Sequence, residues 1–186
     1  RAQGTVRVSG VRLHGGLSLA VRRPFVPAGD VGAVPLNVAL RMKALGVDSN
    51  IISRVGSDED GAEILSYINN QNVSSDSIQV GEDYKTGVVN VMINEKGNAS
   101  YDILYPSSWD KITLTKEMIE KVSESDVFIF GSLICRDEIS RSTLYALLDK
   151  AKYKVFDANL RAPYYTTEVL LELMSKADFI KLNDEE

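Results

Sequence analysis

Two short segments near the end of the sequence carry side chains suited to binding phosphates. Asp157 to Arg161 reads DANLR and Lys181 to Glu186 reads KLNDEE, and each follows an apolar run typical of a buried strand. In open parallel sheets, ligands bind where the carboxyl ends of neighbouring strands meet. We therefore expect the amide, guanidinium and carboxylate groups of both segments to lie along one shared edge, where hydroxyls and phosphates could meet.

The second segment allows two interpretations. Asn183 is placed to begin a helix, and Glu186, three residues later, lies one turn away on the same side. An amide and a carboxylate so placed can orient a phosphate and a hydrated Mg²⁺. A plain helix start explains the same spacing, because Asn at the cap with Glu at the third position resembles a capping box. For an isolated N-x-x-E pattern, the capping box is the better explanation.

Two segments in the first third of the chain could also face a ligand. In the first, Gly32 and Ala33 precede Asn37, so that small residues lead into a helix whose first turn carries an amide. Backbone N–H groups in such a loop can approach a ligand closely, and an amide can both donate to and accept from sugar hydroxyls. A loop followed by a helix start explains the segment equally well. The second, Val55 to Gly61 (VGSDEDG), we interpret mainly as a strand-end turn with Asp58 as a helix cap.

Several classes of function are excluded by composition and by missing motifs. The sequence has no G-x-x-x-x-G-K-[ST] loop and no G-x-G-x-x-G motif, and its only histidine is His14, so neither a P-loop nor a histidine-based active site is supported. The net charge is −5 and the pI is about 5.0, which argues against nucleic-acid or anionic-membrane partners. Cys135 is the only cysteine and lies in an apolar run, which predicts an inert core thiol and a reducing, cytoplasmic location.

Apolar periodicity and helix-capping residues predict an alternation of strands and helices. Helices are expected at about 35–45, 58–70, 115–123, 138–150 and 167–176, and strands at about 50–55, 126–130, 153–157 and 178–182. This order is typical of an α/β fold with a mostly parallel sheet and helices on both faces. Two β-rich runs at 86–94 and 99–104, joined by Glu95-Lys-Gly-Asn98, predict a hairpin outside that sheet, such as a small β lid.

Residues 1–29 differ from the remainder of the chain. They contain five Arg and no Asp or Glu, whereas all 26 acidic residues lie from Asp30 onward. An organellar transit sequence could have this charge, but scattered Gly and Pro residues disfavour an amphipathic helix. We therefore interpret 1–29 as an atypical leader, non-native or misread, joined to 30–186, which is the N-terminal part of a truncated domain.

Taken together and in order, these segments resemble the ribokinase-like PfkB family of carbohydrate kinases, and the wording FDANLRAPYY followed by ADFIKLN is most similar to fructokinases. The family's sugar loop corresponds to Gly32–Asn37, its V-G-x-D-x-x-G motif to Val55–Gly61, and its lid to about 86–104. The last two motifs correspond to Asp157–Arg161 and Lys181–Glu186.

The resemblance implies ATP-dependent phosphorylation of a sugar hydroxyl, with a small-molecule sugar as substrate and a possible homodimer through the lid. The catalytic base of the family is an Asp in a G-A-G-D turn that follows the N-x-x-E motif. We therefore expect both this base and the adenine-binding region beyond Glu186, and expect this truncated N-terminal part to be inactive alone. Two departures are Ala33, which replaces a glycine, and the lack of an acidic residue in the segment that should form the first strand. By resemblance, the residues expected to bind are Gly32, Ala33 and Asn37 for the sugar, Asn159, Arg161, Lys181 and Asn183 for phosphates of ATP, and Glu186 for Mg²⁺ through water.

Two alternatives remain open from the sequence. The chain could belong to a kinase of another sugar or of a nucleoside in the same family, because Arg161 does not discriminate among acceptors. It could also be a non-catalytic sugar-binding module that retains the fold without the base.

Overall fold

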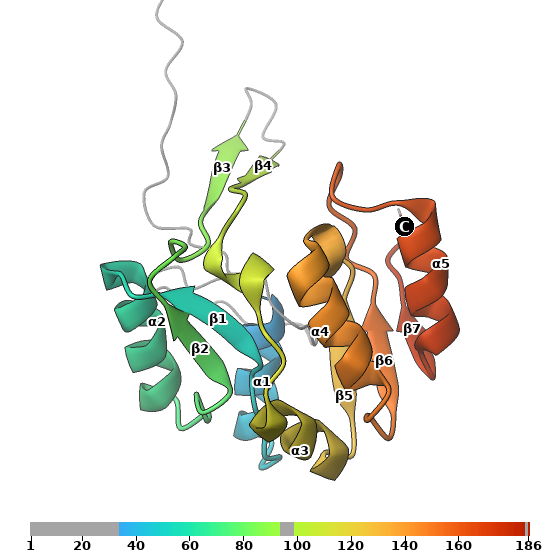
Figure 1. Cartoon of the computed structure of the whole chain (residues 1–186), viewed down its shortest axis with the longest axis horizontal. Helices are drawn as coiled ribbons and strands as arrows, with labels where there is room; N and C mark the ends of the chain where they lie inside the picture. The colour runs from blue at the N-terminus through green and yellow to red at the C-terminus, as the bar shows by residue number, and fades with distance from the viewer. Residues whose placement is uncertain (1–33, 94–98, 185) are drawn as a thin grey trace, which may run out of the picture.

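The computed structural model describes residues 34–93, 99–184 and 186 (Figure 1). Its helices are α1 (Val34–Ala44), α2 (Glu59–Asn70), α3 (Lys116–Glu124), α4 (Glu138–Leu148) and α5 (Thr167–Lys176), with two 3₁₀ helices, η1 (Ser108–Lys111) and η2 (Leu133–Arg136). Its strands are β1 (Ser53–Gly56), β2 (Ile78–Gly81), β3 (Val89–Ile93), β4 (Ala99–Ile103), β5 (Phe128–Gly131), β6 (Lys154–Asp157) and β7 (Phe179–Lys181). The expected alternation of strands and helices is confirmed.

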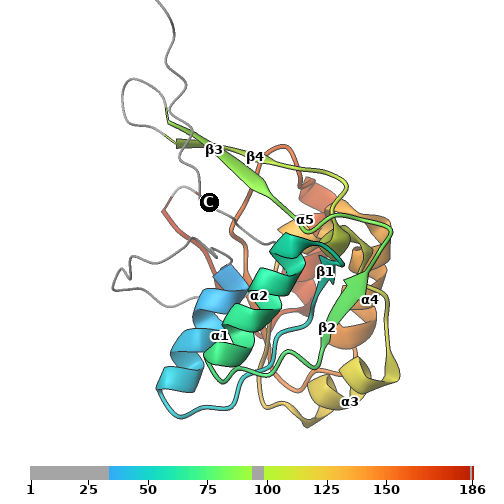
Figure 2. The same ribbon diagram turned by 90° about the vertical axis from the view of Figure 1, so that its left-hand side faces the viewer.

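The parallel strands of the described chain fall into two groups. β1 pairs with β2, and β5, β6 and β7 pair in that order. β3 and β4 form an antiparallel hairpin in which Val89 faces Ile103, and this hairpin stands away from both parallel groups (Figures 1 and 2). The α/β class and the β hairpin are therefore confirmed, the role of the hairpin as a lid stays a prediction, and strand β2 was not predicted.

Local capping explains where the helices begin and end. Asp58 accepts a hydrogen bond from the backbone N–H of Gly61 at the start of α2, as the sequence predicted. Thr115 and Thr166 cap α3 and α5 in the same way. Gly46 follows the end of α1 with a φ of 80°, a left-handed conformation that glycine adopts without steric cost.

Buried apolar side chains form two clusters within the described residues. The larger one surrounds β5–β6–β7, where the rings of Phe130 and Phe156 stack at 5.3 Å and where α3, α4 and α5 contribute buried side chains. Cys135 lies in this cluster, and burial raises the pKa of its thiol to about 12, so the predicted inert core thiol is confirmed. The smaller cluster packs α1 and α2 against β1 and β2 (Figure 2).

No helix within the described ranges is long and apolar enough to cross a membrane.

Large apolar side chains are exposed near β7, where Phe179 is 54% and Leu182 is 48% exposed. β7 is also the last strand of its parallel group, with β6 as its described neighbour.

Candidate phosphate-binding site and lid anchors

An acidic and a basic side chain meet at the carboxyl ends of β6 and β7. Asp157 and Lys181 are paired in register across the two strands, and Lys181 Nζ lies 2.9 Å from Asp157 Oδ1. The side chain of Asp157 is 1% exposed, whereas that of Lys181 is 42% exposed. Since a buried charge is costly unless it is paired, Asp157 holds the lysine ammonium at this edge of the sheet.

A carboxylate joins the loops that follow these two strands. Glu186 Oε1 accepts a hydrogen bond from the backbone N–H of Leu160 at 2.7 Å. Its Oε2 accepts from the N–H of Asn183 at 3.0 Å, and Asn183 Oδ1 accepts from the N–H of Glu186 at 3.2 Å. The reciprocal pair has the hydrogen bonds of a capping box. Both carboxylate oxygens therefore accept backbone N–H groups, and the two predicted segments form one connected unit.

The other two residues of this region lie in the loop after β6. Asn159 adopts a left-handed conformation with a φ of 39°, which Asn tolerates better than most residues. Arg161 is half-buried, and its Nη1 donates to the carbonyl of Leu160 at 2.8 Å. The structure thus joins the two segments that carry Asn159, Arg161, Lys181, Asn183 and Glu186, and the roles of these residues in binding phosphate or metal stay predictions.

The residues predicted to bind the sugar are less well defined. Asn37 is exposed in the first part of α1. Gly32 and Ala33 lie outside the described residues. A sugar-binding role for these three residues stays a prediction.

The V-G-x-D-x-x-G segment anchors the first strand of the hairpin. Besides capping α2, Asp58 accepts hydrogen bonds from Thr86 Oγ1 at 2.5 Å and from Thr86 N at 2.9 Å, and Thr86 Oγ1 accepts from Gly56 N at 2.9 Å. Burial alone would raise the pKa of Asp58, but the hydrogen bonds from Thr86 and Gly61 outweigh it and lower the pKa below the usual value. Thr86, just before β3, is thereby fixed to the start of α2.

Two glycines, one in this segment and one beside Thr86, permit close approach of the backbone. A Cβ added at Gly61 would lie 2.1 Å from the carbonyl oxygen of Gly56. A Cβ at Gly87 would lie 2.2 Å from Nε1 of Trp109. Both distances are too short for any side chain, so these glycines let the root of the hairpin pack directly on its surroundings.

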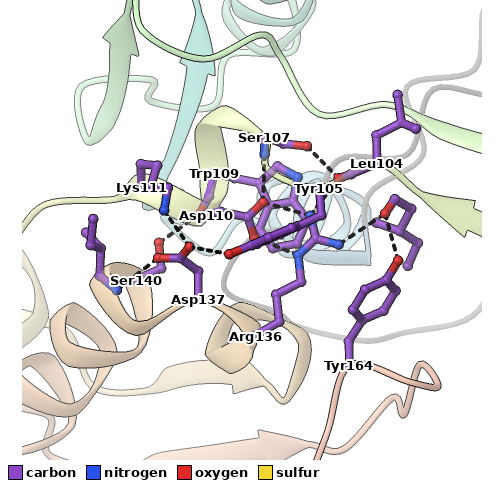
Figure 3. A network of polar contacts seen from close by, with 12 residues as sticks. Leu104, Tyr105, Ser107, Trp109, Asp110, Lys111, Arg136, Asp137, Ser140 and Tyr164 are labelled. Atoms are coloured by element: carbon purple, nitrogen blue, oxygen red, sulfur yellow. Dashed lines mark hydrogen bonds and ion pairs between the residues drawn. The ribbon is translucent and has the colours of Figure 1, made fainter.

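A buried ion pair, not predicted from the sequence, anchors the second strand of the hairpin (Figure 3). Arg136 donates to Asp110 through Nε and Nη2, both at 2.7 Å, and its side chain is 2% exposed while that of Asp110 is fully buried. The guanidinium lies 4.0 Å from the ring centroid of Trp109. Such two-point pairing fixes the plane of the guanidinium.

The same guanidinium holds the end of β4. Arg136 donates to the carbonyls of Ile103 at 3.3 Å and Leu104 at 2.7 Å. Tyr164 donates its hydroxyl to the carbonyl of Ile103 at 3.0 Å, and its ring lies 4.9 Å from the guanidinium (Figure 3). The last residues of the hairpin are therefore tied both to η2 and to the loop between β6 and α5.

A second polar group lies beside this network. Asp137 accepts hydrogen bonds from Lys111 Nζ at 2.5 Å and from the hydroxyl of Tyr105 at 3.0 Å (Figure 3). Burial would raise the pKa of Asp137, but these hydrogen bonds and that from Ile139 N lower it overall. The hydrogen bond with Asp137 also raises the pKa of Lys111.

Comparison with known proteins gives consistent results. A family model described as pfkB family carbohydrate kinase matches residues 26–186. Fructokinase-2 of Zea mays is 29% identical over 181 residues, which is 92% of this chain and 53% of the relative. An uncharacterized sugar kinase of Pyrococcus horikoshii, PH1459, is 32% identical over 165 residues, or 83% of this chain and 53% of that protein. The chain thus spans about half the length of these curated relatives.

Solved structures show the same fold. The crystal structure of PH1459 superposes with a TM-score of 0.76 at 27% identity, covering 95% of this chain and 65% of the other, and PH1459 has also been solved in complex with ATP. Fructokinase from Vibrio cholerae, solved with fructose, ADP and calcium ion bound, superposes with a TM-score of 0.69 at 19% identity, covering 95% of this chain and 59% of the other. At that identity the second match is evidence for the fold alone.

Proposed function

The chain belongs to the pfkB family of carbohydrate kinases, and on this premise we propose that it supplies the sugar- and phosphate-binding part of an enzyme that transfers phosphate from ATP to a sugar hydroxyl. The observation that carries the proposal is the bridge from Glu186 to the backbone of Leu160. It makes one unit of the two segments that carry Asn159, Arg161, Lys181 and Asn183.

Phosphoryl transfer needs little covalent chemistry from a protein, because catalysis consists mostly of positioning and of stabilising negative charge. The ammonium of Lys181 and the guanidinium of Arg161 supply positive charge toward phosphates of ATP. The amides of Asn159 and Asn183 supply neutral donors. Asp157 keeps Lys181 at the edge of the sheet, 2.9 Å from its own Oδ1, so the ammonium need not be ordered on binding.

The donor set at Glu186 fits a hydrated Mg²⁺. Magnesium retains several waters and is bound through one or two carboxylates together with substrate phosphates. Since each carboxylate oxygen of Glu186 already accepts a backbone N–H, contact through water fits better than direct coordination. When bound, the ion would neutralise charge on the phosphates.

Fructose is the acceptor that we favour, with Gly32, Ala33 and Asn37 as its contacts and the β3–β4 hairpin as a lid over it. Similarity to the maize fructokinase across most of this chain supports this choice. A kinase of another sugar or of a nucleoside is the second candidate, because the five residues proposed to bind phosphate or metal do not determine which acceptor is bound.

Three further proposals follow from the family. Residues 30–186 form the N-terminal part of the kinase domain, the protein acts in the cytoplasm, and two copies associate through their lids. Analytical ultracentrifugation of the protein with and without residues 89–103 tests the last of these, since deletion of the hairpin should leave a monomer.

A coupled assay of ADP release by the complete gene product tests the proposed activity. We expect turnover that requires both ATP and Mg²⁺ and that is fastest with fructose in a panel that includes ribose, a 2-keto-3-deoxy sugar acid and adenosine. Turnover fastest with another acceptor would favour the second candidate. Binding of fructose without any ATP-dependent turnover would contradict the kinase assignment and would favour a non-catalytic sugar-binding module.

A further inference from the structure

One hydrogen bond connects the lid directly to the loop that follows β6. The hydroxyl of Tyr164 donates to the carbonyl of Ile103, the last residue of β4, across a separation of 61 residues. Ile103 is paired with Val89, the first residue of β3, and the N–H of Leu104 donates to Val88. The bond therefore lies at the root of the hairpin, where β3 begins and β4 ends.

Tyr164 also belongs to the phosphate-facing loop. Its backbone N–H donates to the carbonyl of Arg161 at 2.8 Å. One residue earlier in the same loop, the N–H of Leu160 donates to Glu186 at 2.7 Å. A continuous chain of short contacts thus runs from the N-x-x-E segment, through Arg161 and Tyr164, to the lid root.

The ring of Tyr164 is held in place by a rigid neighbour. The guanidinium of Arg136 lies 4.9 Å from the ring centroid and donates to the same carbonyl of Ile103. Because Arg136 is itself fixed by Asp110, the phenol hydroxyl has little freedom to turn away from the lid.

We propose that Tyr164 is a positioning residue that latches the root of the lid onto the phosphate-facing loop. Occupancy of that loop by a polyphosphate then restrains the hairpin, although no atom of the ligand touches it. The transmission of ligand binding rests on the proposed function, whereas the latch itself does not. Coupling of this kind requires that the two sites share a contact that both can bias.

Tyr164→Phe removes the hydroxyl and retains the ring over Arg136. Tyr145→Phe is a matched control, because the hydroxyl of Tyr145 donates to Glu172 at 2.9 Å between α4 and α5, away from the hairpin. Both variants lose one phenol hydrogen bond from a partly buried tyrosine. They differ in whether that bond reaches the lid.

Hydrogen exchange of the ligand-free protein tests the latch. Amide exchange reports the free energy of local opening, and loss of one net hydrogen bond of about 1 kcal/mol corresponds to about fivefold faster exchange. We expect this acceleration in peptides spanning 88–93 and 99–104 of Tyr164→Phe. Tyr145→Phe should exchange there as the unchanged protein does. Equal exchange in all three proteins would overturn the latch.

Sodium tripolyphosphate, added with MgCl₂, tests the transmission. In the unchanged protein and in Tyr145→Phe, we expect slower amide exchange both in peptides spanning 157–161 and in those of the lid root. In Tyr164→Phe, we expect slower exchange in peptides spanning 157–161 alone. Protection of the lid in all three would overturn transmission through Tyr164. If no peptide is protected in any protein, the proposed phosphate site is contradicted, and the ligand-free comparison alone decides whether the latch exists.

Discussion

The carboxylate of Glu186 lies 2.7 Å from the backbone nitrogen of Leu160, and this bond joins segments that are 26 residues apart in the sequence. The second carboxylate oxygen closes the cap at Asn183. Glu186 is therefore a structural bridge as well as the proposed partner of hydrated Mg²⁺, and the two roles predict different responses to substitution.

Glu186→Gln retains an acceptor for Leu160 but removes the negative charge. We expect affinity for MgATP to fall by about 10- to 100-fold, the usual effect of losing a group that orients a bound metal. The free energy of unfolding should fall by about 1 kcal/mol, because the amide NH₂ cannot accept the second of the two backbone N–H groups that the carboxylate accepts. Isothermal titration with MgATP and urea denaturation measure the two effects. Asp184→Asn is the control, because Asp184 is exposed in the same segment. Equal affinity of Glu186→Gln and the unchanged protein would remove Glu186 from the metal site.

The ion pair between Arg136 and Asp110 predicts a large loss of stability. Arg136→Met leaves the fully buried carboxylate of Asp110 without its counter-ion, which costs about 3–5 kcal/mol. Urea denaturation measures this cost. The double variant Arg136→Met/Asp110→Asn should recover part of the loss, since no uncompensated charge remains.

Lys116→Met provides the comparison for Arg136. Its ammonium pairs with Glu120 one turn away at 3.3 Å, but the side chain is 84% exposed. An exposed pair of this kind contributes at most about 0.5 kcal/mol. If Arg136→Met cost no more than Lys116→Met, the buried pair would not anchor the lid.

Substitution of either of two glycines should lower the stability of the fold, and the physical reason should differ between them. Gly61→Ala places a Cβ 2.1 Å from a backbone oxygen, and we expect a loss of about 1–3 kcal/mol from steric overlap. Gly46 has open space around it but a φ of 80°, so Gly46→Ala should cost about 1–2 kcal/mol through backbone strain. Thermal unfolding of Gly46→Asn and Gly61→Asn separates the two causes. Asn tolerates a left-handed backbone, so Gly46→Asn should be more stable than Gly46→Ala. At Gly61 the steric overlap remains, so Gly61→Asn should be no more stable than Gly61→Ala. Equal recovery at both positions would contradict the steric explanation.

Acid should destabilise the lid anchors. The pKa values of Asp58 and Asp137 are lowered from 3.8 in the fold, so the folded state binds fewer protons than the unfolded state as the pH falls through this range. Their contribution is present above pH 3.8 and is lost as the pH falls toward the lower folded values. Stability measured from pH 6 to pH 3 should decline less in Asp58→Asn than in the unchanged protein. Asp126→Asn, at an exposed carboxylate, should not alter the slope.

Local patterns in the sequence were sufficient to predict most elements and part of the site. The cap at Asp58 and the spacing of Asn183 and Glu186 were predictable because each involves residues within one helical turn. Strand β2 was missed because its sequence, IQVG, has only two apolar side chains, and one of them, Val80, is 57% exposed. A short, half-exposed strand buries too little apolar surface to give a clear period.

The lid anchors could not be predicted, because they depend on contacts distant in sequence. Arg136 meets Asp110 across 26 residues and Leu104 across 32, and nothing local distinguishes it from a surface arginine. Tyr164 likewise lies within the FDANLRAPYY wording, but nothing in that wording indicates that its hydroxyl contacts Ile103. Which charged side chains become buried depends on tertiary packing, and a single sequence does not reveal that packing.

The left-handed backbone of Asn159 allows its side-chain role to be separated from its conformational role. Asn159→Gly removes the amide and permits a φ of 39°, whereas Asn159→Ala removes the amide and adds strain of about 1–2 kcal/mol. If the amide contacts phosphate, both variants should bind MgATP more weakly by about 10- to 100-fold, the effect of losing one hydrogen bond to a charged group, and only Asn159→Ala should unfold at lower urea. Calorimetric titration and urea denaturation on the same samples measure the two. Unchanged MgATP binding by Asn159→Gly would show that the residue serves the turn and not the ligand.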